Sequence, residues 1–128
     1  MTRIPEMWTE LDGYLREAEA IVARLPDRDK RFRDRVAYQR RGFELARRKC
    51  AIRDAVFVGR KKFRPEGLTA ENRQRIEAFL QWIANTRKTH AESKGYWPPL
   101  IPRYYYAQLE HRLKKALSEI DRAGTKPD

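Results

Sequence analysis

Hydrophobic residues recur with helical spacing near the start of the chain. Between residues 8 and 25 the intervals alternate between three and four, which is typical of a helix that packs in a bundle. The members of this stripe are Trp8, Leu11, Leu15, Ala18, Val22 and Leu25, and Met7, Tyr14 and Ile21 widen it on one side. Pro26 follows, and a proline interrupts helical hydrogen bonding. The pattern predicts a first helix that ends at Leu25.

The segment 27–58 has apolar residues on two opposite sides of a helix. One stripe holds Phe32, Val36, Phe43, Cys50 and Phe57, and the other holds Tyr38, Leu45, Ile52 and Val56. A helix with two apolar faces is covered on both, either by its own bundle or by another subunit, so a homo-oligomer is an open alternative. Residues 55–58 also match a short strand. Because a lone strand has no evident partner here, we assign them to the helix.

Two further helices complete the pattern. Thr69 is suited to cap a third helix, whose apolar face is Ile76, Phe79, Leu80 and Ile83. Pro102 fits the first turn of a fourth helix, with Gly124 as its stop. The face of the fourth helix holds Tyr105 or Tyr106, Leu109, Leu113, Leu117 and Ile120. We predict an all-α fold, a four-helix bundle that forms a single helical domain over residues 1–124, with a loose tail at 125–128.

Positive charge is concentrated in one block of the chain. The 128 residues include 29 Lys+Arg and 18 Asp+Glu, a formal net charge of +11. Residues 26–64 hold 15 of these basic residues and 5 of the acidic ones, so nearly the whole excess lies there. Two explanations of this excess need no binding partner: a charged helix face that is only solvated, and a codon usage that favours arginine. Concentration in one element favours a polyanionic partner.

Two clusters in this block are candidate nucleic-acid-binding residues. The first lies between the two apolar stripes of the second helix and consists of Arg33, Arg40, Arg41, Arg47 and Arg48. The second lies in a basic turn, residues 59–67, and consists of Arg60, Lys61, Lys62 and Arg64. Both would neutralise backbone phosphates, and the chain has no motif for reading base sequence.

An aromatic and proline-rich connector at residues 95–102 precedes the fourth helix. Tyr96, Trp97 and Tyr104 are candidates for stacking unpaired bases or for docking a partner protein. The alternative is that these rings and prolines only cover the end of the bundle.

The sequence offers little for catalysis. His90 and His111 have no acidic residue at a helical spacing that would place both on one face. Cys50 is the single cysteine and lies on an apolar stripe. We therefore expect no enzyme, no cofactor and no metal site. The absence of paired cysteines and of a long apolar run favours a cytoplasmic protein without membrane association.

The chain resembles the accessory variability proteins of diversity-generating retroelements. The similar segments are Leu25-Pro26 before a basic second helix, Leu68 to Asn72 at the start of the third, and Tyr105 to Leu109 with Ser118 to Arg122 in the last. Arg122-Ala123-Gly124 stands where the family's Gly-Gly-Trp ending is expected. The resemblance implies a short basic four-helix bundle that assembles into a pentameric barrel and binds a reverse transcriptase and nucleic acid.

The sequence thus predicts a non-catalytic nucleic-acid-binding accessory protein. It would contact the backbone of DNA or RNA within a larger nucleoprotein assembly, such as a reverse-transcriptase or CRISPR-effector complex. The alternative is a phage- or plasmid-type interaction module or inhibitor that binds an acidic surface of a partner protein.

Overall fold

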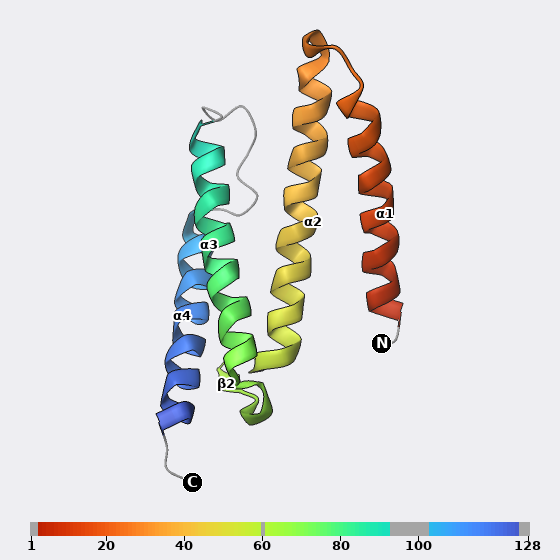
Figure 1. Cartoon of the computed structure of the whole chain (residues 1–128). Coiled ribbons are helices and arrows are strands. Elements are labelled where there is room, and N and C mark those ends of the chain that lie inside the picture. Colours follow the sequence, from red (N-terminus) through yellow and green to blue (C-terminus); the bar gives the residue numbers. More distant parts are fainter. Residues whose placement is uncertain (1–2, 60, 93–102, 126–128) are drawn as a thin grey trace. The chain divides into compact units, whose positions relative to one another are not determined.

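The computed structural model describes residues 3–59, 61–92 and 103–125 (Figure 1). This part of the chain is mostly helical, as the predicted all-α class requires. Its helices are α1 (Arg3–Ala23), α2 (Lys30–Val56), α3 (Ala70–Glu92) and α4 (Arg103–Thr125). The chain packs as two compact units, residues 1–47 and 48–128, and α2 contributes to both. The single domain predicted for residues 1–124 stays a prediction.

The first unit consists of α1 and the N-terminal part of α2. Trp8 of α1 meets Phe43 of α2 edge to face, with ring centroids 5.6 Å apart. Phe43 is buried, whereas Met7, Tyr14 and Ile21 on the widened side of the α1 stripe are exposed. Leu11, a member of the stripe itself, is also exposed, so only part of the predicted apolar stripe packs against α2. The first helix ends at Ala23, two residues before the predicted end.

The second unit has its core between α3, α4 and the last turns of α2. The largest fully buried side chains are Phe79, Ile76, Ile83, Leu113 and Val56. Ion pairs join α3 and α4 at both ends, Arg73 to Asp121 at 2.8 Å and Arg87 to Glu110 at 2.6 Å. Because the start of α3 pairs with the end of α4 and the end of α3 with the start of α4, the two helices are antiparallel. The apolar faces predicted for these helices are therefore the faces that pack together.

A short β-hairpin follows α2 where the sequence predicts the end of a helix and a turn. Strand β1 (Phe57–Val58) pairs antiparallel with β2 (Lys62–Phe63), with Phe57 opposite Phe63. The helical assignment of the last two residues of 27–58 is therefore wrong. The missing strand partner lies inside the predicted basic turn. Gly59 makes the reversal with a φ of 71°, a conformation that glycine adopts without strain.

The predicted start of α3 is confirmed, whereas the predicted end of α4 is not. Thr69 caps α3, because its Oγ1 accepts a hydrogen bond from the amide of Asn72 at 3.2 Å. Helix α4 includes Gly124 and ends at Thr125, so Gly124 is not its stop. Residues 126–128 of the predicted tail lie outside the described residues. No helix within the described ranges is long and apolar enough to cross a membrane.

Gly67 lies against the backbone of α2 just before α3 begins. A Cβ atom at this position would overlap the carbonyl oxygen of Ala55 and lie 3.1 Å from the Cα of Val56. The carbonyl oxygen of Gly67 also accepts a hydrogen bond from the buried Asn72 side chain at 2.9 Å. The missing side chain thus allows the segment before α3 to approach α2 closely.

We predict that Gly67→Ala lowers the free energy of unfolding by about 1–3 kcal/mol, because a methyl group there must displace backbone atoms. Urea unfolding followed by circular dichroism measures the change. Gly13→Ala is the matched control, since a Cβ at this exposed helical position meets nothing within 4 Å. It should stabilise the protein by about 0.5–1 kcal/mol. Equal effects of the two substitutions would contradict the close approach.

Candidate functional site

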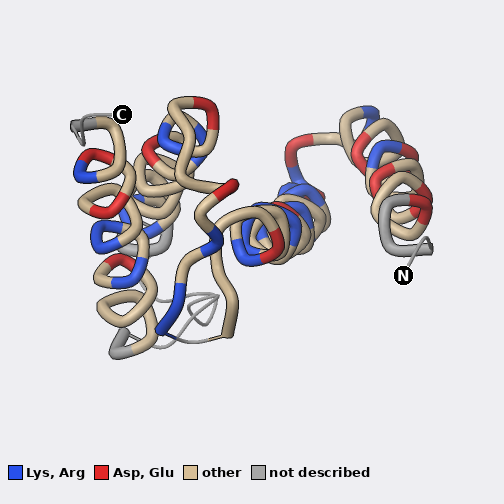
Figure 2. The backbone as a smooth tube through the Cα atoms, turned by 90° about the horizontal axis from the view of Figure 1, so that it is seen from below, with Lys and Arg blue, Asp and Glu red and all other residues tan. Residues whose placement is uncertain are grey.

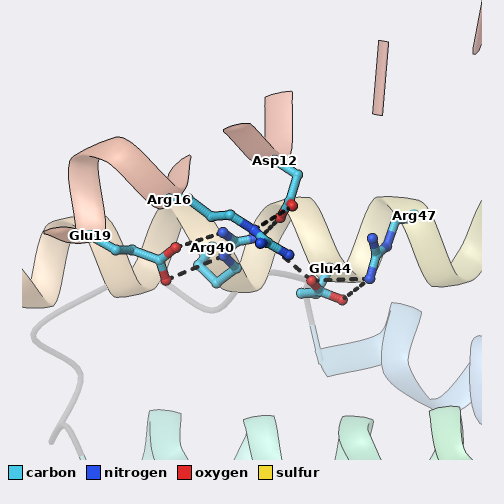
Figure 3. A network of polar contacts seen from close by, with 6 residues as sticks. All are labelled: Asp12, Arg16, Glu19, Arg40, Glu44 and Arg47. Carbon is cyan, nitrogen blue, oxygen red and sulfur yellow. Dashed lines mark hydrogen bonds and ion pairs between the residues drawn. The ribbon is translucent and has the colours of Figure 1, made fainter. Parts of the chain in front are cut away.

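Arg40 on α2 binds two carboxylates of α1. Its Nη1 donates to Asp12 Oδ1 at 2.5 Å, and its Nη2 donates to Glu19 Oε1 at 2.6 Å (Figure 3). A third carboxylate, that of Glu44, lies 3.7 Å away on α2 itself. The Arg40 side chain is 19% exposed. The guanidinium therefore joins the two helices of the first unit rather than facing solvent.

The electrostatics of this cluster agree with its geometry. The hydrogen bond from Arg40 holds the pKa of Asp12 below its ordinary value of 3.8. The hydrogen bond to Glu19, followed by that to Asp12, raises the pKa of Arg40. Each group stabilises the charged form of the other. A phosphate would have to displace these carboxylates to reach Arg40, which makes Arg40 a poor candidate for the contact that the sequence predicts.

The other members of the predicted ridge have separate surroundings. Arg33 donates to Asp27 at 2.9 Å, and Arg47 forms an ion pair with Glu44 at 3.3 Å. Arg41 has no carboxylate partner among the residues that the structure describes. Arg48 lies over the ring of Trp82 in the second unit, with its guanidinium 5.9 Å from the centroid. The structure therefore does not place the five arginines in one continuous free array.

The two units of the structure divide the basic block at residues 26–64 between them and differ in net charge. Residues 1–47 contain 11 Lys+Arg and 9 Asp+Glu, so the first unit has a net charge of +2. Residues 48–128 contain 18 Lys+Arg and 9 Asp+Glu, so the second has a net charge of +9. Figure 2 shows basic positions along α2 and in the segment that follows it. The positive excess therefore belongs to the second unit.

Much of the acidic charge of the second unit is already paired with arginines. The pairs in question are Arg53–Asp54, Arg73–Glu77, Arg73–Asp121, Arg75–Glu71, Arg87–Glu110 and Arg122–Glu119. Several described cations of this unit form no ion pair. Five of them come from the end of α2, from the hairpin and the residue after it, and from α4. They are Lys49, Lys61, Lys62, Arg64 and Arg112.

Two of these unpaired cations lie over aromatic rings. Lys49 Nζ is 5.3 Å from the ring centroid of Tyr105, and the guanidinium of Arg112 is 4.9 Å from that of Phe57. Ring faces attract a cation but leave its positive charge available to an anion. Sequence reasoning missed both residues, because each stands among other charged residues and their proximity depends on how α2 and α4 pack.

Of the other predicted site residues, some lie at the hairpin and others lie outside the part of the chain that the structure describes. Lys61 and Lys62 are exposed at the hairpin, and Arg64 is half-buried just after it. Arg60, Tyr96 and Trp97 lie outside the described residues, as does the side chain of Tyr104. Among the residues described, no group of three His, Cys, Asp or Glu side chains is placed to hold a metal ion.

Comparison with known proteins gives no relative: no family model matches the chain, and no curated protein or solved structure is significantly similar to it.

We predict that Arg40→Gln raises the pKa of Asp12 toward 3.8 and destabilises the first unit, because Asp12 and Glu19 lose their shared guanidinium. The pKa of Asp12 is lowered in the folded state. Its contribution to stability is therefore present above 3.8 and is lost as the pH falls through the lower folded value. Carboxyl ¹³C titration by NMR measures the pKa, and urea unfolding measures stability.

Two controls accompany this experiment. Arg16→Gln removes another cation that contacts Asp12, but from a side chain that is 77% exposed, so its effect should be smaller. Asp121, whose pKa is lowered chiefly by the hydrogen bond from Arg73, should titrate unchanged in both variants. An unaltered Asp12 pKa in Arg40→Gln would contradict the assignment.

Proposed function

We propose that the protein is a non-catalytic nucleic-acid-binding accessory protein that contacts the phosphate backbone mainly through its second unit. The observation that carries this proposal is the net charge of +9 in that unit, against +2 in the first. The proposed contacts are Lys49, Lys61, Lys62, Arg64 and Arg112. Of the predicted ridge, Arg41 remains a candidate, whereas Arg40 is occupied by carboxylates.

Physical chemistry sets the character of such binding. Lysines on a hairpin and cations over aromatic rings neutralise phosphates without reading base edges, so affinity depends little on sequence. Binding releases counterions from the nucleic acid and therefore weakens steeply with added salt. An accessory role within a larger nucleoprotein assembly, such as a reverse-transcriptase or CRISPR-effector complex, is consistent with a small chain that supplies charge rather than catalysis.

We also propose that the four helices form a bundle and that the chain forms homo-oligomers. Support comes from the side of α1 that does not meet α2. Met7, Tyr14 and Ile21 recur there at seven-residue intervals, with exposed fractions of 56%, 60% and 63%. Large apolar side chains aligned along one helix edge are suited to pack against another helix. Contact with a second copy of the chain would bury this edge.

The same edge favours the alternative function, a protein-interaction module or inhibitor. Such a module would use α1 to bind a partner and its cations to complement an acidic surface. The absorbance ratio at 260 and 280 nm of the purified protein distinguishes the two functions at low cost. Co-purified nucleic acid raises this ratio and favours the nucleic-acid-binding function.

We predict that the variant Lys49→Gln, Lys61→Gln, Lys62→Gln, Arg112→Gln binds nucleic acid at least about tenfold more weakly than the wild type. For every phosphate of duplex DNA that the variant no longer neutralises, the slope of log affinity against log salt should become shallower by about 0.9. Titrations against single-stranded and duplex DNA and RNA at about 50 and 200 mM salt measure both quantities.

The matched control removes the same charge from the first unit. It combines Arg16→Gln, Arg24→Gln, Arg28→Gln and Lys30→Gln, all at exposed positions. This variant should retain most of the affinity. If both variants bind equally weakly, only net charge matters and the second unit is not the interface. If the wild type binds none of the four polymers, the proposed function is wrong.

For the α1 edge we predict that Ile21→Lys dissociates the homo-oligomer, raising its dissociation constant by about tenfold or more, because a buried isoleucine is worth about 1.5–3 kcal/mol. Sedimentation velocity over a range of concentrations measures the change. Ala20→Lys, at the adjacent exposed position, should leave the oligomer intact. A wild-type chain that stays monomeric at every concentration would refute the oligomer.

A further inference from the structure

A small cavity opens in the second unit beneath the cations at the end of α2. Its volume is about 40 Å³, and it is partly open to solvent. The walls are apolar, formed by Ile52, Phe79 and Leu113 among others, and three cations line it: Lys49, Arg53 and Arg112. A cavity needs roughly 10–15 Å³ to hold one water molecule, so this one accommodates a group of about three heavy atoms, such as a branched methyl pair.

The cations at this cavity have few anionic partners within the described structure. Of the three, Arg53 alone has a carboxylate neighbour there, Asp54, at 3.2 Å, and that carboxylate is 64% exposed. The Nε of Arg112 is buried and has no hydrogen-bond partner among the described residues. Lys49 and Arg112 lie over ring faces, those of Tyr105 and Phe57. A buried guanidinium N–H without an acceptor is unfavourable, and a ligand that supplies an acceptor removes this penalty.

These features together define the chemistry of a ligand. The apolar wall selects a dehydrated aliphatic group, and the cations at its border select an adjacent anion. A carboxylate suits Arg112, because its two oxygens match the planar donor array of a guanidinium. A phosphodiester, strongly hydrated and without an aliphatic end, would leave the apolar wall unused. The cavity therefore differs in preference from the hairpin lysines.

We propose that this cavity is a binding site for a small amphipathic carboxylate, whose branched aliphatic end enters the cavity while its carboxylate pairs with Arg112 and Lys49. The carboxylate belongs either to a free aliphatic acid or to adjacent leucine and glutamate side chains of a partner protein, since the two present the same chemistry. The site shares Lys49 and Arg112 with the proposed nucleic-acid surface, but it is tested with a small acid alone, so either proposal can fail while the other stands.

The experiment is an NMR titration of the full chain with 4-methylpentanoate, which carries an isobutyl-like end and one carboxylate. The methyl resonances of Ile52, Leu109 and Leu113, which line the cavity, should shift together. The neutral isostere 4-methylpentanamide lacks the charge-assisted hydrogen bond, and acetate and inorganic phosphate lack the branched apolar group. Each should bind about tenfold more weakly at this site.

An acetylated and amidated Leu-Glu dipeptide tests the protein-borne source. Tighter binding than the free acid favours a protein-borne carboxylate, and weaker binding favours a free acid.

Substitutions separate the two halves of the site. Arg112→Gln should reduce the affinity for the acid about tenfold and leave that for the amide unchanged. Lys115→Gln is the matched control, because it removes one positive charge from an exposed position of α4 that does not line the cavity. If the amide or phosphate binds as well as the acid, if Lys115→Gln acts like Arg112→Gln, or if the cavity methyl groups do not shift, the proposal is wrong.

Discussion

The pairing of Arg40 with Asp12 and Glu19 is the interaction on which the first unit depends. A single guanidinium on α2 donates hydrogen bonds to both carboxylates of α1 and so joins the two helices. It also brings acidic residues of α1 to a basic helix, so that the first unit is nearly neutral. An arginine placed between two carboxylates stabilises helix packing at the expense of its availability to a ligand.

The second unit has the opposite balance. Its arginines on α3 and α4 occupy the local carboxylates, while cations at the end of α2, at the hairpin and at Arg112 lie over rings or in solvent. Charge that no internal partner neutralises is the property that a polyanion can use. The hairpin adds to it, because Lys62 in β2 and Lys61 in the turn before it are both exposed.

The apolar residues of the second unit serve both stability and recognition. Phe57 follows the last residue of α2, pairs with Phe63 across the hairpin at 5.2 Å and lies beneath Arg112. The cavity beside it retains apolar walls because the side chains of α2, α3 and α4 do not fill the space between them. A cation held over such a wall attracts a different anion from one held in solvent, since dehydration strengthens its interactions.

The sequence by itself determined the helical class, the cap at Thr69, the apolar faces of α3 and α4 and the excess of positive charge. These depend on local spacing and composition, which a single chain displays directly. Tertiary structure alone decided that Arg40 is occupied, that Phe57–Val58 pairs with Lys62–Phe63 and that Lys49 and Arg112 border one cavity. Periodicity reveals which side of a helix a residue is on, but the partner across from it depends on how separate segments pack, and a side chain's charge is available only where no such partner neutralises it.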